Sequence, residues 1–458
     1  MQITLKQLVN WLQIEQPEIH TPDITITGVS TDTRTIEHGN LYIPLIGERF
    51  DGHDFISEAV EAGAAAILVE RQRQLPDVDC PYFEVPDTLK ALQQLAQAYR
   101  HHLAIPVVAV TGSNGKTTTK DLIAAVLSTK YVVHKTKGNL NNHIGLPLSL
   151  LSMPEQAEVA VLEMGMSHAG EIAQLSRIAC PDYAVITNVG DAHIAFFNSQ
   201  RDIAKAKLEI VTGLKPEGLL YVNGDNRLLR EETVGIGRQV RTVGLAEDVD
   251  VKGVDVKVIT PHTTSFRTEN NPYRYELPLI GKHNVTNALF AVAIGRQMGL
   301  TESEIAHGLQ EVQLSGRRLQ LRETKRGMRV IDDSYNANPT AVRAGVNTLT
   351  EVTDKQRKWV LLGDIFELGA REEQLHRELG RFVRDKKSIE YIFTIGKRAR
   401  WIHEEALGVD RTPDTVIHFH TVEEAIHDLR RRDNPDTVLL VKASRGMALD
   451  RVVDALCH

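Results

Sequence analysis

The sequence is poor in cysteine and holds no long apolar run or basic block, and each shortage excludes a class of protein. Its three cysteines, Cys80, Cys180 and Cys457, stand far apart with no CxxC spacing, so we expect neither a disulfide framework nor a zinc knuckle. No apolar stretch approaches the roughly 18 residues of a membrane-spanning helix. The formal net charge of −7 is spread along the chain, without the basic cluster that nucleic acid binding requires. We therefore expect no membrane insertion, no nucleic acid partner and no catalytic cysteine.

What remains is the composition of an ordinary globular protein of several domains. Hydrophobic residues make up 42% and charged residues 25% of the chain, and no low-complexity segment interrupts it. A length of 458 residues exceeds what one hydrophobic core serves. Residues 1–18 lack the basic segment, apolar core and cleavage site of a secretion signal. The sequence predicts a multidomain cytoplasmic protein, which we expect to be a monomer.

Short apolar runs alternate with helical patterns along the chain, which predicts an α/β protein of three domains. Continuous apolar runs after residue 105 are typical of buried strands in a parallel sheet, whereas alternating polar and apolar residues between 241 and 279 indicate antiparallel strands. After Arg318 the βα alternation restarts and indicates a second parallel sheet. The predicted domains are a small N-terminal α/β domain (1–84), a central domain with a mostly parallel sheet (85–313) and a C-terminal Rossmann-like domain (314–458).

These patterns give specific strands and helices. The predicted strands cover residues 24–29, 41–46, 65–69, 106–110, 158–162, 183–187, 218–222, 249–259, 273–277, 329–331, 358–362, 391–395, 416–419 and 437–441. The helices predicted with them cover residues 53–62, 88–101, 121–128, 284–298 and 302–310.

A glycine-rich loop at residues 111–119 lies between a predicted strand and a predicted helix. This context is typical of a phosphate-binding loop, in which backbone N–H groups and a helix N-terminus surround phosphate and a lysine reaches the outer phosphates. The spacing of Gly112, Gly115 and Lys116 is two residues shorter than in the general pattern, and a glycine-rich turn without a ligand is the alternative. The residues predicted to bind ATP here are Gly112, Ser113, Asn114, Gly115, Lys116, Thr117 and Thr118.

Three further side chains are candidates for the chemistry beside this loop. Glu163 ends a predicted parallel strand and His193 follows the next one, so both are expected at the carboxyl edge where ligands bind. A hydroxyl at Thr117 and the carboxylate of Glu163 can hold Mg²⁺ against the phosphates. Lys205 and Lys207 lie on a predicted helix, and from pattern alone both would be ordinary surface lysines.

Together these residues resemble the Mur ligases, the ATP-dependent amino acid and peptide ligases of peptidoglycan synthesis. The resemblance runs the whole chain in order, and within the family it is closest to the enzymes that add D-alanyl-D-alanine to UDP-N-acetylmuramoyl-tripeptide. The family motifs are residues 111–119, 163–165, 188–193, 207, 281–288 and 332–339, and the stretches that favour this branch are 32–34, 47, 51–55, 139–147, 362–369 and 441–447.

The resemblance implies an ADP-forming ligase with a uridine-nucleotide domain, a central ATPase domain and a C-terminal domain that closes over the site. ATP would phosphorylate the terminal carboxylate of the tripeptide to an acyl phosphate. The amine of D-alanyl-D-alanine would then attack, and the tetrahedral intermediate would release phosphate. Attack of a carboxylate on a phosphate joins two anions, so positioning and charge neutralisation should dominate catalysis.

The resemblance also assigns roles to individual residues. Lys116 would bind the β and γ phosphates, Thr117 and Glu163 would hold one Mg²⁺, and His193 would help to hold a second. Lys207 would be carbamylated, which turns it into a carboxylate-like metal ligand, whereas Lys205 keeps its surface interpretation.

The remaining assignments concern the nucleotide and the two other substrates. Asn287 would contact ATP, Arg318 would contact its phosphates, and Asp333 would contact its ribose. Arg317 stands next to Arg318, so it is open which of the two arginines takes this role. A structural salt bridge is the alternative for either arginine. The substrate residues implied are Thr31, Asp32 and Arg34 for the uridine nucleotide, Asn141 for the muramoyl region, and Asn336, Asn338, Lys442 and Arg445 for the peptides. His143 departs from the pattern, because glutamate is expected there.

Two other functions stay open at this point. One is a ligase of the same kind that adds a single amino acid, or an enzyme similar to folylpolyglutamate synthase; residues 32–34, 51–55 and 362–369 argue against these. The other is a phosphate-loop ATPase that acts as a conformational switch. A switch would release phosphate without needing both peptide substrates, and it leaves Glu163, His193 and Lys207 unexplained.

Overall fold

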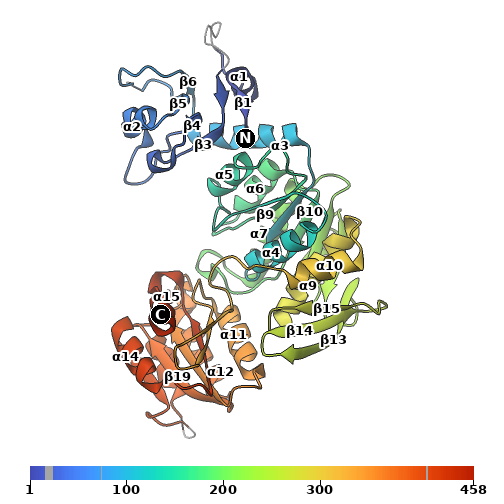
Figure 1. Ribbon diagram of the computed structural model, residues 1–458, viewed down its shortest axis with the longest axis vertical. Helices are drawn as coiled ribbons and strands as arrows, with labels where there is room; N and C mark the ends of the chain where they lie inside the picture. Colours follow the sequence, from blue (N-terminus) through green and yellow to red (C-terminus); the bar gives the residue numbers. More distant parts are fainter. Residues whose placement is uncertain (16–23, 74, 409–410) are drawn as a thin grey trace.

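The computed structural model describes residues 1–15, 24–73, 75–408 and 411–458, and Figure 1 shows its three consecutive bodies. The central body lies between the N-terminal body and the C-terminal body, each built on its own main sheet. Residues 16–18 of the N-terminal stretch interpreted above lie outside the described part. Among the described helices, none is both long and apolar enough to cross a membrane.

The N-terminal body is a four-stranded parallel sheet in the order β3-β4-β5-β6, beside the antiparallel pair β1-β2. Its last strand extends one residue past the predicted boundary at 84. Its elements are β1 (Ile3–Thr4), α1 (Leu5–Leu12), β2 (Thr25–Ile26), β3 (Gly28–Ser30), η1 (Thr33–Thr35), β4 (Asn40–Tyr42), η2 (Gly52–Phe55), α2 (Ile56–Glu61), β5 (Ala66–Glu70) and β6 (Tyr82–Val85).

The central body holds a nine-stranded sheet in the order β15-β14-β13-β12-β11-β10-β7-β9-β8. Its strands are β7 (Val107–Thr111), β8 (Val133–Lys135), β9 (Val159–Glu163), β10 (Tyr183–Ile186), β11 (Leu219–Asn223), β12 (Gln239–Gly244), β13 (Val251–Thr260), β14 (Thr263–Thr268) and β15 (Arg274–Leu277). Its helices are α3 (Thr88–Leu103), α4 (Lys116–Leu127), α5 (Gly145–Leu151), α6 (Glu171–Ala179), η3 (Ile194–Phe196), α7 (Gln200–Leu208), η4 (Glu209–Thr212), α8 (Arg227–Thr233), α9 (Lys282–Gln297) and α10 (Glu302–Gln310).

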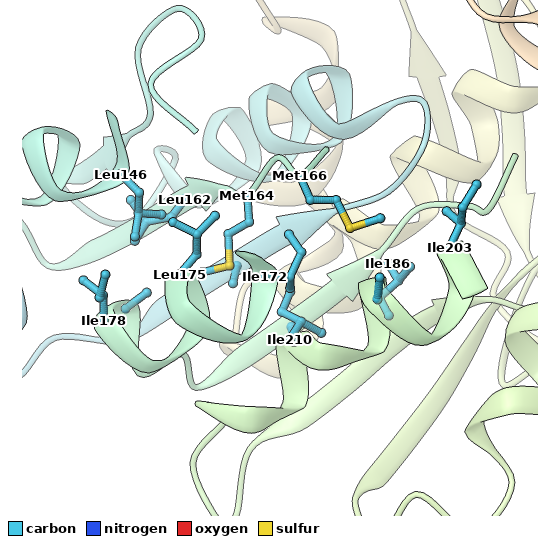
Figure 2. Close-up of a cluster of buried hydrophobic side chains, with 14 of the residues drawn as sticks. Leu146, Leu162, Met164, Met166, Ile172, Leu175, Ile178, Ile186, Ile203 and Ile210 are labelled. Carbon is cyan, nitrogen blue, oxygen red and sulfur yellow. The ribbon is translucent and has the colours of Figure 1, made fainter. Parts of the chain in front are cut away.

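The two faces of the central sheet belong to different hydrophobic clusters because successive strand residues point to opposite sides. On β7, Val107 and Ala109 join the cluster that contains α3, α5 and α6, whereas Val108 and Val110 join the cluster with α4, α9 and α10. Figure 2 shows the first of these, where Ile172, Leu175 and Ile178 of α6 pack toward the sheet. Both faces are covered, which explains why β7 and β9 read as continuous apolar runs.

The C-terminal body is a six-stranded sheet in the order β16-β17-β21-β18-β19-β20. Its elements are β16 (Gln320–Glu323), β17 (Arg329–Asp332), α11 (Pro339–Glu351), β18 (Arg357–Gly363), η5 (Gly369–Arg371), α12 (Glu372–Arg384), β19 (Ile389–Ile395), α13 (Ala399–Ala406), β20 (Val416–Phe419), α14 (Val422–Arg432), β21 (Thr437–Lys442), η6 (Arg445–Met447) and α15 (Asp450–Cys457).

The predicted α/β class is confirmed, and two details of the strand pairing were wrong. The antiparallel section of the central sheet is shorter than predicted, since β12 runs parallel to both β11 and β13 and only β13, β14 and β15 pair antiparallel. Alternating polarity indicates one solvated face, and the parallel strand β12 also has one, because exposed and half-buried residues alternate over its first four positions. The C-terminal sheet is not wholly parallel, because β16 adds an antiparallel edge strand that carries no apolar run. The boundaries of the three domains stay a prediction.

Candidate active site

A cavity of about 610 Å³ lies between the central and C-terminal bodies, and most of the predicted site residues line it. The central body contributes the carboxyl ends of β7, β9 and β10, the edge where parallel sheets bind ligands. The predicted residues that line the cavity are Ser113, Asn114, Gly115, Lys116, Thr118, Asn141, Glu163, His193, Asn287, Arg318, Asp333, Asn336, Asn338, Lys442 and Arg445.

Two glycines give the phosphate loop its conformation. A Cβ on Gly112, at φ +152°, would meet the Thr187 hydroxyl oxygen at 1.8 Å. Gly115 has φ +77°, and a Cβ there would lie 2.8 Å from the Asn287 side-chain oxygen. Helix α4 starts directly after Gly115, and no described side chain caps it. Its first N–H groups are therefore available to an anion such as phosphate.

Asn188, at the end of β10, fixes the other side of this loop. Its backbone oxygen accepts from the Ser113 N–H at 3.0 Å, and its side-chain oxygen accepts from the Asn114 N–H at 2.9 Å. The Lys116 ammonium folds back to donate to the Gly112 carbonyl at 2.9 Å. Hydrogen bonds within the chain thus fix the conformation of the loop, and phosphate can replace the Gly112 carbonyl as the partner of the Lys116 ammonium.

The Thr117 hydroxyl and the Glu163 carboxylate form an oxygen pair suited to Mg²⁺. Thr117 Oγ1 donates to Glu163 Oε2 at 2.7 Å, and Asn141 Nδ2 donates to Glu163 Oε1 at 2.8 Å. Hydroxyl and carboxylate oxygens are the donors that Mg²⁺ prefers. Among the described residues no group of three or more His, Cys, Asp or Glu side chains is assembled for a metal. The residues therefore fit an ion that takes its remaining ligands from phosphate and water.

Two lysines lie near this edge of the sheet. Lys207 is 2% exposed, whereas its neighbour Lys205 is exposed, so the helix pattern was wrong for Lys207. Burial, and next the Lys116 charge, hold the pKa of Lys207 well below its usual value. Burial also lowers the pKa of Lys116, with Glu163 opposing this and Arg318 adding to it. In the described part of the chain, neither lysine has an ion pair.

His193 faces the C-terminal body from the loop after β10. Its Nδ1 lies 2.6 Å from Glu367 Oε2, in an orientation too poorly aligned for a hydrogen bond. Burial lowers the pKa of His193, the Glu367 carboxylate opposes that shift, and Lys116 and Lys207 reinforce it. A neutral imidazole can act as a metal ligand.

The structure separates the roles of the two adjacent arginines. Arg317 lies 2.8 Å from Asp454 and 3.3 Å from Asp332, so it takes the structural salt-bridge role. Arg318 lines the cavity, and its buried Nε has no hydrogen-bond partner among the described residues. The segment before them is anchored to the phosphate-loop helix, because the Ser315 N–H donates to the Asp121 carboxylate at 2.7 Å.

Tyr335 lies between two arginines of the C-terminal body. The Arg318 guanidinium carbon is 4.2 Å and that of Arg445 is 5.2 Å from the centre of its ring. The Arg445 side chain also donates to the Tyr335 hydroxyl at 3.3 Å. Cation–π contacts of this kind orient a guanidinium while leaving its N–H groups available to an anion.

Four other predicted residues of the C-terminal body form hydrogen bonds at the cavity. Lys442 donates to the Asp333 carboxylate at 2.5 Å and to the Asn336 carbonyl at 3.0 Å. Asn338 donates to the side-chain oxygen of Asn114 at 2.6 Å, which joins the C-terminal body to the phosphate loop. Lys442 is therefore paired to the residue predicted for the ribose, and it does not stand as a separate charge for the peptide.

The structure does not bring the predicted uridine residues to this cavity. Thr31, Asp32 and Arg34 lie in the N-terminal body, where Asp32 and Arg34 form an ion pair at 2.6 Å. The Arg34 side chain is 87% exposed. Gly112, Thr117 and Lys207 lie close to the cavity without lining it, and His143, the departure from the family pattern, does line it.

Sequence reasoning gave no role to several residues that shape the site. Asn188, Tyr335 and Glu367 were quoted within motifs but received no function. His283, which also lies in a family motif and received no function, lines the cavity. Burial lowers its pKa to about 4, with Asp333 opposing and Lys442 adding to the shift. A polar residue inside a matched motif was the available signal, but a contact between domains cannot be read from spacing.

The loop geometry predicts the effect of Gly115→Ala. Alanine pays about 1–2 kcal/mol for the left-handed backbone and also approaches Asn287, so ATP binding should weaken at least about tenfold. The matched control is Gly235→Ala, which has φ +76° and open space around its Cβ. Isothermal titration with ATP and thermal melting of both variants test this prediction. We expect similar losses of stability in the two variants, but weaker ATP binding only in Gly115→Ala. Equal ATP affinities of the two variants would contradict it.

Comparisons with known proteins identify the family of the chain. Three family models match the chain: "Mur ligase family, catalytic domain" at residues 25–100, "Mur ligase middle domain" at 110–295 and "Mur ligase, glutamate ligase domain" at 317–445. The UDP-N-acetylmuramoyl-tripeptide–D-alanyl-D-alanine ligase of Bacillus subtilis (strain 168) is 44% identical over 444 residues, which cover 97% of this chain and 94% of the relative.

Solved structures show the same likeness. MurF from Acinetobacter baumannii superposes with a TM-score of 0.89 at 31% identity, covering 100% of this chain and 99% of that one. MurF from Thermotoga maritima, solved in complex with ADP, has a TM-score of 0.84 at 30% identity and covers 95% of this chain and 98% of that one. The chain belongs to the Mur ligase family.

Proposed function

We propose that this chain is the ligase that joins D-alanyl-D-alanine to UDP-N-acetylmuramoyl-tripeptide at the expense of ATP, with ADP and phosphate released. The relative that is 44% identical over nearly the whole chain is named for this reaction, and one solved neighbour holds ADP. The observation that carries the proposal is that a phosphate loop and cationic side chains of the C-terminal body line the same cavity.

The first step is the transfer of the γ-phosphoryl group of ATP to the terminal carboxylate of the tripeptide. The N–H groups at the start of α4 bind the phosphates, and Lys116 leaves the Gly112 carbonyl to neutralise them. Arg318 approaches from the other body, with its guanidinium held over Tyr335. These cations lower the repulsion between the carboxylate and the phosphates. Positioning of the two reacting groups then lowers the barrier further.

Magnesium would be held by Thr117 and Glu163 in one position and by His193 with carbamylated Lys207 in a second. Bound there, it supplies charge neutralisation at the phosphates and at the acceptor carboxylate. Asn141 fixes the Glu163 carboxylate through its 2.8 Å hydrogen bond. We further propose that Asn287 contacts the nucleotide and that Asn336, Asn338 and Arg445 lie near the peptides, and the presence of all four at the cavity supports this.

The second step is the attack of the D-alanyl-D-alanine amine on the acyl phosphate, with release of phosphate. We also propose that the enzyme acts as a monomer in the cytoplasm, where ATP is available. The N-terminal body, with Thr31, Asp32 and Arg34, would hold the uridine nucleotide at a distance from the reacting carboxylate.

A substrate matrix tests the reaction. UDP-N-acetylmuramoyl-tripeptides ending in L-lysine or diaminopimelate are each combined with D-alanyl-D-alanine, D-alanine or L-glutamate, and ADP and ligated product are measured. We expect both signals only with D-alanyl-D-alanine. Product with a single amino acid would favour another Mur-type ligase, and ADP formation that ignores both peptide substrates would favour a switch ATPase.

Carbamylation of Lys207 has a direct test. A neutral buried amine can add CO₂, whereas a charged surface ammonium cannot. We expect a carbamate signal in the ¹³C NMR spectrum of enzyme equilibrated with ¹³C-bicarbonate. The signal should survive Lys205→Ala and vanish in Lys207→Ala; a spectrum without a carbamate signal in the unaltered enzyme would refute the modification.

A further inference from the structure

A turn of the C-terminal body reaches across the cavity to the loop that carries His193. The turn lies between β18 and η5, and Glu367 within it makes two contacts with the central body. Its carboxylate oxygen lies 2.6 Å from His193 Nδ1, and its backbone carbonyl accepts from the Ala195 N–H at 3.1 Å. Gly369 packs on the same loop, where a Cβ would lie 3.1 Å from Ala195 Cα. The contact is therefore continuous along the turn.

Several bonds hold Glu367 in an uncommon backbone conformation. It has φ +62°, in the left-handed region that non-glycine residues avoid. The Ile365 N–H donates to His376 Nε2 at 3.1 Å, and the Phe366 N–H donates to the Ser444 hydroxyl at 2.9 Å. Leu368, on the other side, is 2% exposed. Such a residue persists only where its surroundings determine it, and it clusters at functional sites.

This contact gives the two ring nitrogens of His193 different surroundings. Nδ1 is buried beside Glu367, whereas Nε2 has no hydrogen-bond partner among the described residues, and the ring lines the cavity. In the described part of the chain, His193 is also the sole ion-pair partner of Glu367. A carboxylate at one ring nitrogen fixes the tautomer and orientation of a histidine whose other nitrogen binds a ligand.

We propose that Glu367 is a positioning residue, which orients the His193 imidazole for metal binding when the C-terminal body is docked on the central body. The inference rests on the proposed function and deepens it. Glu367 does not contact the substrate in this role. It links the arrangement of the two bodies to the metal site, so that the site is complete only when they are together.

The test uses the full-length enzyme with Mn²⁺ in place of Mg²⁺ and a non-hydrolysable ATP analogue. Electron spin-echo spectroscopy reports the ¹⁴N modulation of an imidazole bound to Mn²⁺. We expect the unaltered enzyme to show this signal and His193→Ala to lose it, which assigns it. Glu367→Ala should lose most of the signal as well, and its kcat should fall about 10–100-fold while its KM for ATP and its melting temperature stay unchanged.

Two further variants separate orientation from charge and from structure. Glu367→Gln keeps an oxygen acceptor beside Nδ1 and removes only the charge, so it should recover most of the signal and of kcat. Glu373→Gln is the matched control, since Glu373 is exposed and pairs with Arg377 at 2.8 Å on α12; it should change neither readout.

Three results would overturn the positioning role: an unchanged ¹⁴N signal in Glu367→Ala, an unchanged kcat in that variant, or a Gln variant as defective as the Ala variant. The ligase assay of the unaltered enzyme keeps the two ideas apart. A Glu367-dependent ¹⁴N signal in an enzyme that forms no ligated product would support the positioning role and contradict the proposed function.

Discussion

Cationic side chains that lack a direct ion pair are the constraint around which the cavity is built. Lys116 and Arg318 face the cavity from the two bodies, and neither has an ion pair within the described part of the chain. Lys207 is buried near Lys116, and its lowered pKa favours the neutral amine that carbamylation requires. Buried cations of this kind are costly, which is why the pKa values of both lysines are lowered. A polyphosphate supplies the opposite charge, so nucleotide binding offsets part of this desolvation cost.

Neutral side chains hold the phosphate loop and the charged groups of the cavity in place. Asn188 fixes the phosphate loop through its backbone and side-chain oxygens, and Asn141 fixes Glu163. From the other body, Tyr335 supports Arg318 by its ring face. Because these supports come from separate elements and from two bodies, the charge arrangement depends on how the bodies are docked. The bond between Asn114 and Asn338 makes the phosphate loop itself part of that contact.

Local features were readable from the sequence, whereas contacts between domains were not. The strand at 107–110, the following glycines and the helix predicted the phosphate loop because all three follow from neighbouring residues. The burial of Lys207 was missed by periodicity, since a helix with alternating lysines looks solvated until its neighbours in space are known. Only the resemblance selected Lys207 over Lys205.

The edge strand β16 and the contact of the Glu367 turn could not be predicted from the sequence for a related reason. An edge strand needs no apolar run, and β16 is defined by its pairing with β17. Nothing in the spacing of residues 362–369 says that Glu367 meets His193, 174 positions earlier in the chain, because that contact arises from the docking of two bodies. The paired Asp333 and Lys442 were likewise read as separate ligand contacts.

The most direct measurement of the charge-neutralisation account is product formation by Lys116→Ala. With UDP-N-acetylmuramoyl-tripeptide, D-alanyl-D-alanine and saturating ATP, the account predicts that the rate of pentapeptide formation falls by about 100-fold or more. Lys205→Ala, which removes an exposed lysine, should keep the rate of the unaltered enzyme. An undiminished rate in Lys116→Ala would contradict the account.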